Sequence, residues 1–338
     1  MAFWIRHNYW FYLLAVCLTL MIYLCLNQAV SNSKDTETLS AIQLETELIE
    51  HDRVETLRAA ETRALGILGH GFAEEGLIKP FINYTNNFLV ASDVKLIYCP
   101  IQKSMSQLGS NIMCFLYNEQ QFIARNQSFT DVIYVQENYC LNYQDFVNPT
   151  EKLRNHADTA RFTFIRDPFD RFLSFYLDKC VKHNECYDCG KDMRCVVRRL
   201  YEGLQQIQRK DGKEDYMYAE SHAAPLSWYC NFINDIEKWE LIKIGADKEK
   251  REAAIFQLAR ILKKQGVKQS SIDKITIESL VSETSHATHK SSERAEAERQ
   301  LKEDLFVRDM LHKIYFNDYV VFQFSTEHLD QKYRNYFL

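Results

Sequence analysis

Short runs of strand-forming residues lead directly into amphipathic helices along this chain, and this alternation constrains the fold more than any other feature. The clearest case is RFTFIRDPFDRFLSFYLDKC, residues 161–180, where RFTFI predicts a buried strand. Pro168 suits the first turn of the following helix, where a missing N–H needs no partner. One face of that helix is apolar: Phe169, Phe172, Leu173, Tyr176 and Leu177.

The same order of elements recurs elsewhere. VKLIYC (94–99) predicts a strand, and helical spacing follows at Met105, Leu108, Ile112, Met113 and Leu116. Further strands are predicted at 131–135, 240–244 and 318–324, and further helices at 250–266 and 292–316. Strands that alternate with helices predict an α/β fold with a mainly parallel central sheet flanked by helices.

The N-terminus predicts a membrane anchor. Residues 9–26 are uncharged and apolar, at the short end of the length that crosses a bilayer. Arg6 and His7 precede this run, so the short N-terminal side is expected in the cytosol. A cleaved signal peptide is the alternative, but its apolar region is usually shorter. The predicted organisation is a cytosolic tail (1–8), a transmembrane signal anchor (9–26), a luminal stalk (27–75) and a luminal globular domain (76–338).

The cysteines agree with an oxidising compartment. Eight of the ten follow the apolar run, and an even number there predicts disulfides whose pairing the sequence leaves open. The segment CVKHNECYDCGKDMRC (180–195) could instead hold zinc, although no second spaced pair completes a ligand set. Asn83 and Asn126 begin glycosylation acceptor triplets. The net charge of −5 argues against a nucleic-acid partner.

Two strand-to-helix connections carry groups that can bind phosphate. In YCPIQKSMS the loop offers Lys103, Ser104 and Ser106 beside a helix N-terminus, although it lacks the glycines of a Walker A loop. Arg166 ends the strand RFTFI, and Ser174 lies off the apolar stripe of the next helix, where it can face a ligand or solvent. An arginine fork with a hydroxyl suits a phosphate monoester. The structural alternatives are a surface lysine beside an N-cap serine and an Arg166–Asp170 ion pair.

Together these motifs resemble those of the membrane-bound Golgi carbohydrate sulfotransferases. CPIQKSMSQLGSNIMCFLY resembles their 5′-phosphosulfate loop, and FIRDPFDRFLSFY is similar to their 3′-phosphate motif, R-D-P-[FY]-x-R-[LF]-x-S. HAAPLSWYC, YFNDYVVFQF and the N-terminal anchor also resemble the family, over roughly residues 90–330, with most likeness to its nematode-type, chondroitin-sulfotransferase-related branch. The chain departs from the pattern at Gln102, where the family usually has proline.

The resemblance implies a P-loop-like sulfotransferase fold and 3′-phosphoadenosine 5′-phosphosulfate as donor, with no metal. It implies a single-pass type II Golgi membrane protein with a luminal catalytic domain. The 5′-phosphosulfate would contact Lys103, Ser104, Met105 and Ser106. Arg166 and Ser174 would hold the 3′-phosphate, and Ser291 and Ser292 are further donor contacts.

Sulfuryl transfer needs a base for the acceptor hydroxyl, and histidine is best matched to neutral pH. His222 is the first candidate, with Pro225 and Trp228 as one wall of an acceptor groove, and His156, His289 and Glu220 are alternatives. Lys103 would stabilise charge on the leaving phosphate.

The expected acceptor is a glycan hydroxyl, chiefly of an anionic, chondroitin-like glycosaminoglycan. Two basic segments, 198–213 and 260–268, could attract such a polyanion or simply be solvated helix faces. A catalytically inactive type II membrane protein of the same fold, which binds a glycan or protein partner, is the competing hypothesis. A P-loop kinase is disfavoured by the missing glycines, and the sequence leaves a homodimer open.

Overall fold

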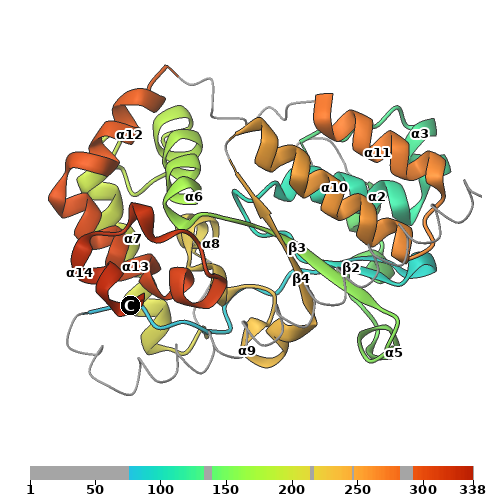
Figure 1. Cartoon of the computed structure of the whole chain (residues 1–338), viewed down its shortest axis with the longest axis horizontal. Coiled ribbons are helices and arrows are strands. Elements are labelled where there is room, and N and C mark those ends of the chain that lie inside the picture. The colour runs from blue at the N-terminus through green and yellow to red at the C-terminus, as the bar shows by residue number, and fades with distance from the viewer. Residues whose placement is uncertain (1–75, 133–138, 214–216, 246, 282–291, 338) are drawn as a thin grey trace, which may run out of the picture. The chain divides into compact units, whose positions relative to one another are not determined.

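Four strands form one sheet in the order β1-β2-β3-β4 (Figure 1). The structure is a computed structural model that describes residues 76–132, 139–213, 217–245, 247–281 and 292–337. The strands are β1 (Leu89–Ala91), β2 (Leu96–Tyr98), β3 (Ala160–Arg166) and β4 (Trp239–Ile244). β1 is antiparallel to β2, whereas β2, β3 and β4 are parallel, with Leu96 opposite Ala160 and Arg161 opposite Trp239. The prediction of an α/β fold with a mainly parallel sheet is confirmed.

The helices before β4 are α2 (Ser106–Tyr117), α3 (Glu119–Ala124), α4 (Gln144–Val147), α5 (Glu151–Arg154), α6 (Pro168–Phe175), α7 (Met193–Arg209), α8 (Tyr218–Ala223) and α9 (Phe232–Asp235). Those after β4 are α10 (Lys248–Lys264), α11 (Gln269–Val281), α12 (Arg294–Glu303), α13 (Leu305–Phe322) and α14 (Gln331–Arg334). A π-helical segment, Tyr176–Lys182, continues α6.

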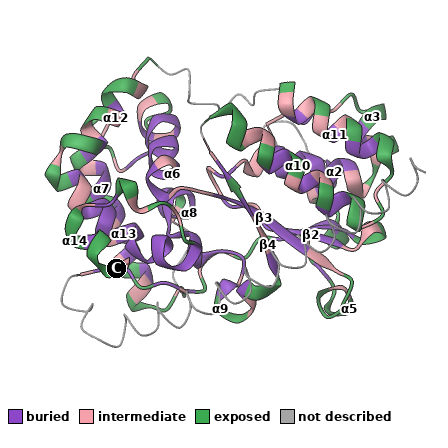
Figure 2. Cartoon of the chain, viewed as in Figure 1, coloured by how far each residue is buried: buried purple, intermediate pink, exposed green. Residues whose placement is uncertain are grey.

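The sheet separates two apolar cores because successive side chains of a strand point to opposite faces. Phe162 and Phe164 of β3 pack with α2, α3, α10 and α11, whereas Ile165 faces α6, α7, α12 and α13. The same two groups of helices lie on opposite sides of the sheet in Figure 1. Figure 2 shows α6 and much of α13 buried between their neighbours, while α12 is largely exposed.

α6 begins as the sequence predicts. Pro168 is its first residue, and the Asp167 carboxylate accepts hydrogen bonds from the backbone N–H groups of Phe169 (2.9 Å) and Asp170 (3.2 Å). An N-cap of this kind contributes about 1 kcal/mol. The strand therefore turns into the helix within two residues and places Arg166 at the carboxyl end of β3.

Two predictions near the C-terminus are wrong. Residues 318–324 do not form a strand, because α13 runs through Phe322 and ends at Gln323 in the left-handed conformation. This half of α13 is buried on nearly all sides, so core packing overrides the strand propensity of its valines and aromatics. The helix predicted at 292–316 is also divided, because the carboxylate of Asp304 caps a new helix through the N–H groups of Phe306 and Val307.

Several predictions fall outside the described residues. These are the anchor (9–26), the stalk (27–75), most of the strand at 131–135, His289 and Ser291. Within the described ranges, none of the helices combines the length and apolarity needed to span a membrane.

Candidate active site

The loop that joins β2 to α2 is fixed at the carboxyl end of the parallel strands. Cys99 begins it and is bonded to Cys230, and its carbonyl accepts a 2.7 Å hydrogen bond from the Thr163 hydroxyl on β3. Lys103 (φ +64°) and Met105 (φ +55°) adopt left-handed backbone conformations that fold the loop tightly onto the start of α2. The first N–H groups of a helix lack partners within it, so this loop presents an anion-binding end.

Two side chains of the loop are buried. The hydroxyl of Ser104 is fully buried and has no hydrogen-bond partner among the described residues. The ammonium of Lys103 forms an ion pair with Asp178, a residue of the π-helical segment after α6. Burial lowers the pKa of Lys103 to about 8, even though the charge of Asp178 acts in the opposite direction. A buried hydroxyl without a partner is costly, and an oxyanion ligand would satisfy it.

Gln102, where the sequence departs from the expected proline, does not leave the loop unsupported. Its backbone carbonyl accepts a 2.9 Å hydrogen bond from the Arg171 guanidinium, and its side chain accepts one from Ser106 (3.4 Å). These contacts hold the loop without the fixed φ that a proline would supply.

Arg166 forms the second anion-binding position. Its Nε atom is buried and has no hydrogen-bond partner within the described part of the chain, and no ion pair joins it to Asp170 there. The Asp167 carboxylate has other hydrogen-bond partners, since it caps α6 and accepts from the Tyr319 hydroxyl. Burial is the main cause of a lowered pKa at Arg166; the charges of Asp170 and Asp167 oppose this effect, and the charge of Arg294 adds to it. A half-buried guanidinium whose Nε atom lacks a hydrogen bond, beside a second arginine, suits an anionic ligand.

Two further serines predicted to contact the donor, Ser174 and Ser292, differ in their exposure. Ser174 is 6% exposed, so the alternative in which it is merely solvated is wrong. Ser292 is exposed and donates a 2.8 Å hydrogen bond to Glu293, next to the start of α12. Arg294, two residues further on, is the group of this segment that acts on Arg166.

His222, the first candidate for the base, lies near enough to Lys103 for the two charges to interact. The charges of Lys103 and Asp178 both act on it, and burial lowers its pKa to about 4. Its Nδ1 atom lies 2.7 Å from the Tyr218 carbonyl, which can only accept. Nδ1 therefore carries the proton in the neutral ring, and Nε2 keeps a lone pair for an incoming proton.

Arg171 connects the Lys103 loop to the segment that carries His222, and it was not identified from the sequence. It is completely buried on α6 and donates to four oxygens: the carbonyls of Gln102 (2.9 Å), His222 (3.3 Å) and Ala224 (2.7 Å), and the Tyr229 hydroxyl (2.9 Å). One side chain thus joins the Lys103 loop to the His222 segment. A second arginine five residues after Arg166, on a helix that starts at the sheet edge, is the signal that could have found it.

The alternatives to His222 are less well placed. His156 is exposed and accepts a hydrogen bond from the Asp158 N–H in the turn before β3, at the opposite end of the strands from Lys103. Glu220 is 2% exposed and bound to the Tyr187 hydroxyl (2.8 Å). The prediction that Pro225 and Trp228 wall an acceptor groove is wrong, because both are buried and the Trp228 indole donates to the Lys79 carbonyl (2.7 Å).

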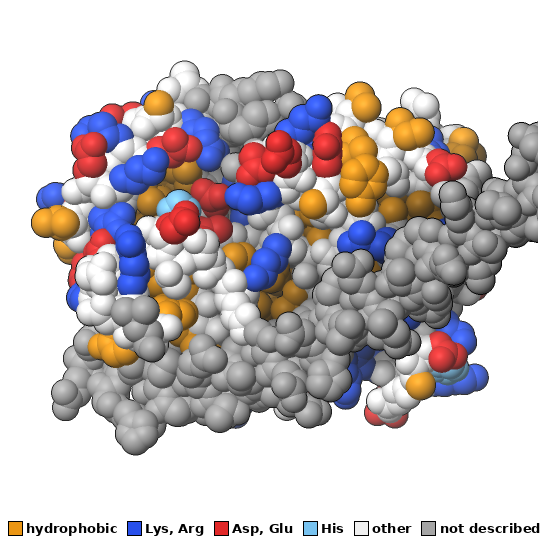
Figure 3. Space-filling model, viewed as in Figure 1, with side chains coloured by type: hydrophobic (Ala, Val, Ile, Leu, Met, Phe, Trp, Pro, Cys, Tyr) orange, Lys and Arg blue, Asp and Glu red, His pale blue; other side chains and the backbone are white. Residues whose placement is uncertain are grey.

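The two basic segments lie on different layers. The cations of 198–213 project from α7 and its end, and those of 260–268 from α10 and the turn after it. On the face shown in Figure 3, Lys and Arg side chains of the described residues are interspersed with Asp and Glu. Among the described residues on that face there is no continuous basic strip.

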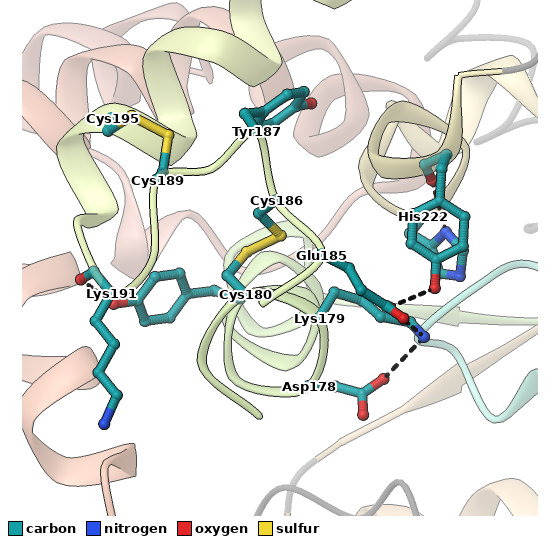
Figure 4. Close-up of a disulfide and its surroundings, with 12 residues drawn as sticks. Asp178, Lys179, Cys180, Glu185, Cys186, Tyr187, Cys189, Lys191, Cys195 and His222 are labelled. Atoms are coloured by element: carbon teal, nitrogen blue, oxygen red, sulfur yellow. Dashed lines mark hydrogen bonds and ion pairs between the residues drawn. A yellow bond between two sulfur atoms is a disulfide. The ribbon is translucent and has the colours of Figure 1, made fainter. Parts of the chain in front are cut away.

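All eight cysteines beyond the apolar run form disulfides: Cys99–Cys230, Cys114–Cys140, Cys180–Cys186 and Cys189–Cys195. Figure 4 shows the last two, in which Cys186 and Cys189 belong to different disulfides and cannot form one metal-binding pair. The zinc alternative is therefore wrong for this segment, and no group of metal-ligating side chains is found among the described residues.

Comparison with known proteins identifies the family of the chain. The model of the sulfotransferase family matches residues 86–325, more than half of the chain. The carbohydrate sulfotransferase chst-1 of Caenorhabditis elegans is 31% identical over 264 residues, which cover 75% of this chain and 79% of the relative. An uncharacterized protein of the same organism is 27% identical over 257 residues, covering 73% of this chain and 71% of the relative. No solved structure matches the chain significantly. By the extent of these matches, this chain belongs to the sulfotransferase family.

Proposed function

We propose that this protein transfers a sulfuryl group from 3′-phosphoadenosine 5′-phosphosulfate to a glycan hydroxyl, with a chondroitin-like glycosaminoglycan as the first acceptor to test. One observation carries the proposal: two buried polar atoms that lack a hydrogen-bond partner among the described residues, the Ser104 hydroxyl and Arg166 Nε, lie at the carboxyl ends of neighbouring parallel strands. Such a pair suits a nucleotide with phosphates at both ends. The name of the nematode relative supports a carbohydrate acceptor.

Two groups of described residues would bind the two ends of the donor. Lys103, Ser104 and the start of α2 would hold the 5′-phosphosulfate, and Arg166 with Arg294 would hold the 3′-phosphate. The donor supplies the activated sulfur. To engage the donor, the Lys103 ammonium exchanges part of its pairing with Asp178 for the phosphate oxygens.

The reaction is an in-line displacement at sulfur. The acceptor oxygen forms a bond to sulfur while the bond between sulfur and the 5′-phosphate oxygen breaks, and the electron pair leaves with the phosphate. His222 Nε2 takes the hydroxyl proton, and its depressed pKa keeps it unprotonated at neutral pH. Lys103 stabilises the charge that accumulates on the leaving phosphate.

The proposed setting is the lumen of the Golgi, with the chain anchored as a single-pass type II membrane protein. The disulfides of the globular domain support an oxidising compartment. Asn83 and Asn126 are both exposed, so a luminal domain should carry glycans there. Full-length protein from a secretory host should lose mass on glycosidase treatment, and the Asn83→Gln, Asn126→Gln double variant should not. No shift for the wild type would contradict a luminal domain.

The direct test uses detergent-solubilised full-length protein, radiolabelled donor and chemically desulfated chondroitin and heparan sulfate. We expect incorporation into a glycan and binding of the product 3′,5′-bisphosphate. Binding without turnover would favour the competing hypothesis of an inactive protein. Neither binding nor turnover would refute the assignment of the donor site.

A further inference from the structure

The buried carboxylate of Asp178 lies close to a histidine as well as to two lysines. The Lys103 ammonium pairs with its Oδ2 atom, and the Lys179 ammonium lies 3.9 Å from the same oxygen. The Nε2 atom of His183 lies 3.6 Å from the other oxygen, Oδ1. One carboxylate therefore pairs with the donor-binding lysine through one oxygen and faces a titratable imidazole through the other.

The cysteine-rich insert holds His183 in this position. The disulfide Cys180–Cys186 closes the loop that carries it, and the Glu185 N–H donates to the Lys179 carbonyl (2.8 Å). Figure 4 shows Asp178, Lys179 and Glu185 beside this disulfide. The His183 side chain is 38% exposed, so protons from the solvent reach the imidazole although Asp178 itself is buried.

The charges of this region nearly balance before a donor binds. Its charged and titratable side chains come from the donor loop (Lys103), from the π-helical segment and the loop after it (Asp178, Lys179, Lys182, Glu185) and from α8 (Tyr218, His222). Burial raises the pKa of Tyr218 and lowers that of His222 to about 4, so both are neutral near pH 7. Apart from Lys182, which is exposed, two carboxylates then face two ammonium groups. A proton on His183 adds one positive charge to them.

Donor binding disturbs this balance. In the proposed function, Lys103 exchanges part of its pairing with Asp178 for phosphate oxygens, which leaves a buried carboxylate near an incoming anion. A buried charge that loses its partner is costly. The Lys179 ammonium is already 3.3 Å from Glu185. A protonated His183 needs to move only a few tenths of an ångström to donate a charged hydrogen bond to Oδ1.

We propose that His183 is a positioning residue for the donor, which takes up a proton when the donor binds and replaces Lys103 as the partner of Asp178. His183 acts through Asp178 and does not contact the donor. This inference rests on the proposed function and gives the first disulfide of the insert a part in it. If binding takes up a proton, acid favours the complex. This contribution to nucleotide affinity should therefore fall as the pH rises through the range in which histidines titrate, between about pH 5 and pH 8.

The first test measures the protons that accompany binding. Full-length, detergent-solubilised protein is titrated with adenosine 3′,5′-bisphosphate in a calorimeter near neutral pH, in two buffers of different ionisation enthalpy. Wild type should take up more protons per nucleotide than His183→Gln, which is polar but does not titrate. The phosphates of the nucleotide titrate alike in both experiments and cancel in the difference. Equal proton uptake would overturn the inference and leave the proposed function intact, whereas a wild type that binds no bisphosphate would overturn both.

His156→Gln is the matched control. The His156 side chain is also 38% exposed, and its Nδ1 atom lies 3.7 Å from the Asp158 carboxylate. It precedes β3 and therefore lies at the opposite end of the strands from Lys103. His156→Gln should show the proton uptake of the wild type. A reduced uptake in this variant equal to that of His183→Gln would contradict a specific role of His183.

The second test replaces the titratable charge with a fixed one. His183→Lys carries a cation throughout the range, so its nucleotide affinity relative to wild type should rise about 3- to 10-fold from about pH 6 to about pH 7.5. Over the same range, His183→Gln should change from weaker binding than wild type to nearly equal binding. Because the side chain is 38% exposed, neither substitution should unfold the protein. Affinity ratios that do not change with pH would contradict the inference.

Discussion

The ammonium of Lys103 and the carboxylate of Asp178 form a buried ion pair, with side chains only 9% and 1% exposed. The pair joins the loop after β2 to the π-helical segment after α6. It keeps a cation available inside the site before the donor arrives, at a place where an unpaired charge would be costly.

The pair predicts a pH dependence. Because the pKa of Lys103 is about 8 and the ammonium is the active form, kcat/KM for the donor should fall above about pH 8. Asp178→Asn removes the charge that raises this pKa, so the alkaline limb should move to lower pH. Glu202→Gln on the exposed face of α7 is the control. The same limb in wild type and Asp178→Asn would show that Lys103 does not govern it.

His222 gives a second pH prediction. Its pKa in the folded protein is about 4 and its ordinary value is 6.5, so the folded state favours the neutral ring. The unfolded chain then binds a proton first as the pH falls, and stability should decrease from about pH 6.5 to about pH 4. His222→Asn should remove this part of the decrease and lower kcat by at least about 100-fold. An undiminished kcat would exclude His222 as the base.

Arg166 should discriminate between nucleotides. Arg166→Met should weaken binding of adenosine 3′,5′-bisphosphate by roughly 10- to 100-fold, because hydrogen bonds to charged groups contribute about 1.5–3 kcal/mol. Binding of adenosine 5′-phosphate, which lacks the 3′ group, should hardly change. Titration calorimetry measures both, with Arg260→Met on the exposed face of α10 as control. An equal loss for the two nucleotides would place Arg166 elsewhere than at the 3′-phosphate.

Arg171 should matter for stability and for activity. Arg171→Met would remove a donor from four oxygens, three of them in buried hydrogen bonds, and we expect a loss of about 3–5 kcal/mol in the free energy of unfolding. Arg171→Lys keeps the charge but cannot reach all four oxygens. It should retain more stability than Arg171→Met and still lower kcat/KM. Denaturant unfolding and steady-state kinetics separate the two effects, and a fully active Arg171→Lys would argue against a positioning role.

The disulfides should differ in their contribution to the free energy of unfolding. Cys99–Cys230 closes a loop of 131 residues and Cys189–Cys195 one of 6. On chain entropy alone, the first should contribute about 4–5 kcal/mol and the second about 2 kcal/mol. Paired Cys→Ala variants test this by chemical unfolding. Equal losses would mean that loop entropy does not set the difference.

The sequence determined the local parts of this protein. Strand-forming runs followed by periodic helices fixed β2, β3, β4, α6 and α10, since these patterns act within a few residues. Pro168 marked the start of α6 by its backbone chemistry, and the sulfotransferase motifs predicted site roles for Lys103, Arg166 and His222.

The tertiary structure decided the rest, because long-range contacts leave no periodic trace in a sequence. Nothing local in Asp178 or Glu185 indicates that one pairs with Lys103 and the other binds Tyr218. The four disulfide pairs likewise required the folded chain. The segment 318–324 has the composition of a strand, yet the buried position of α13 made it helical. Strand propensity contributes less free energy than the burial of apolar side chains. Which side chains are buried is known only once the helices and strands are packed together.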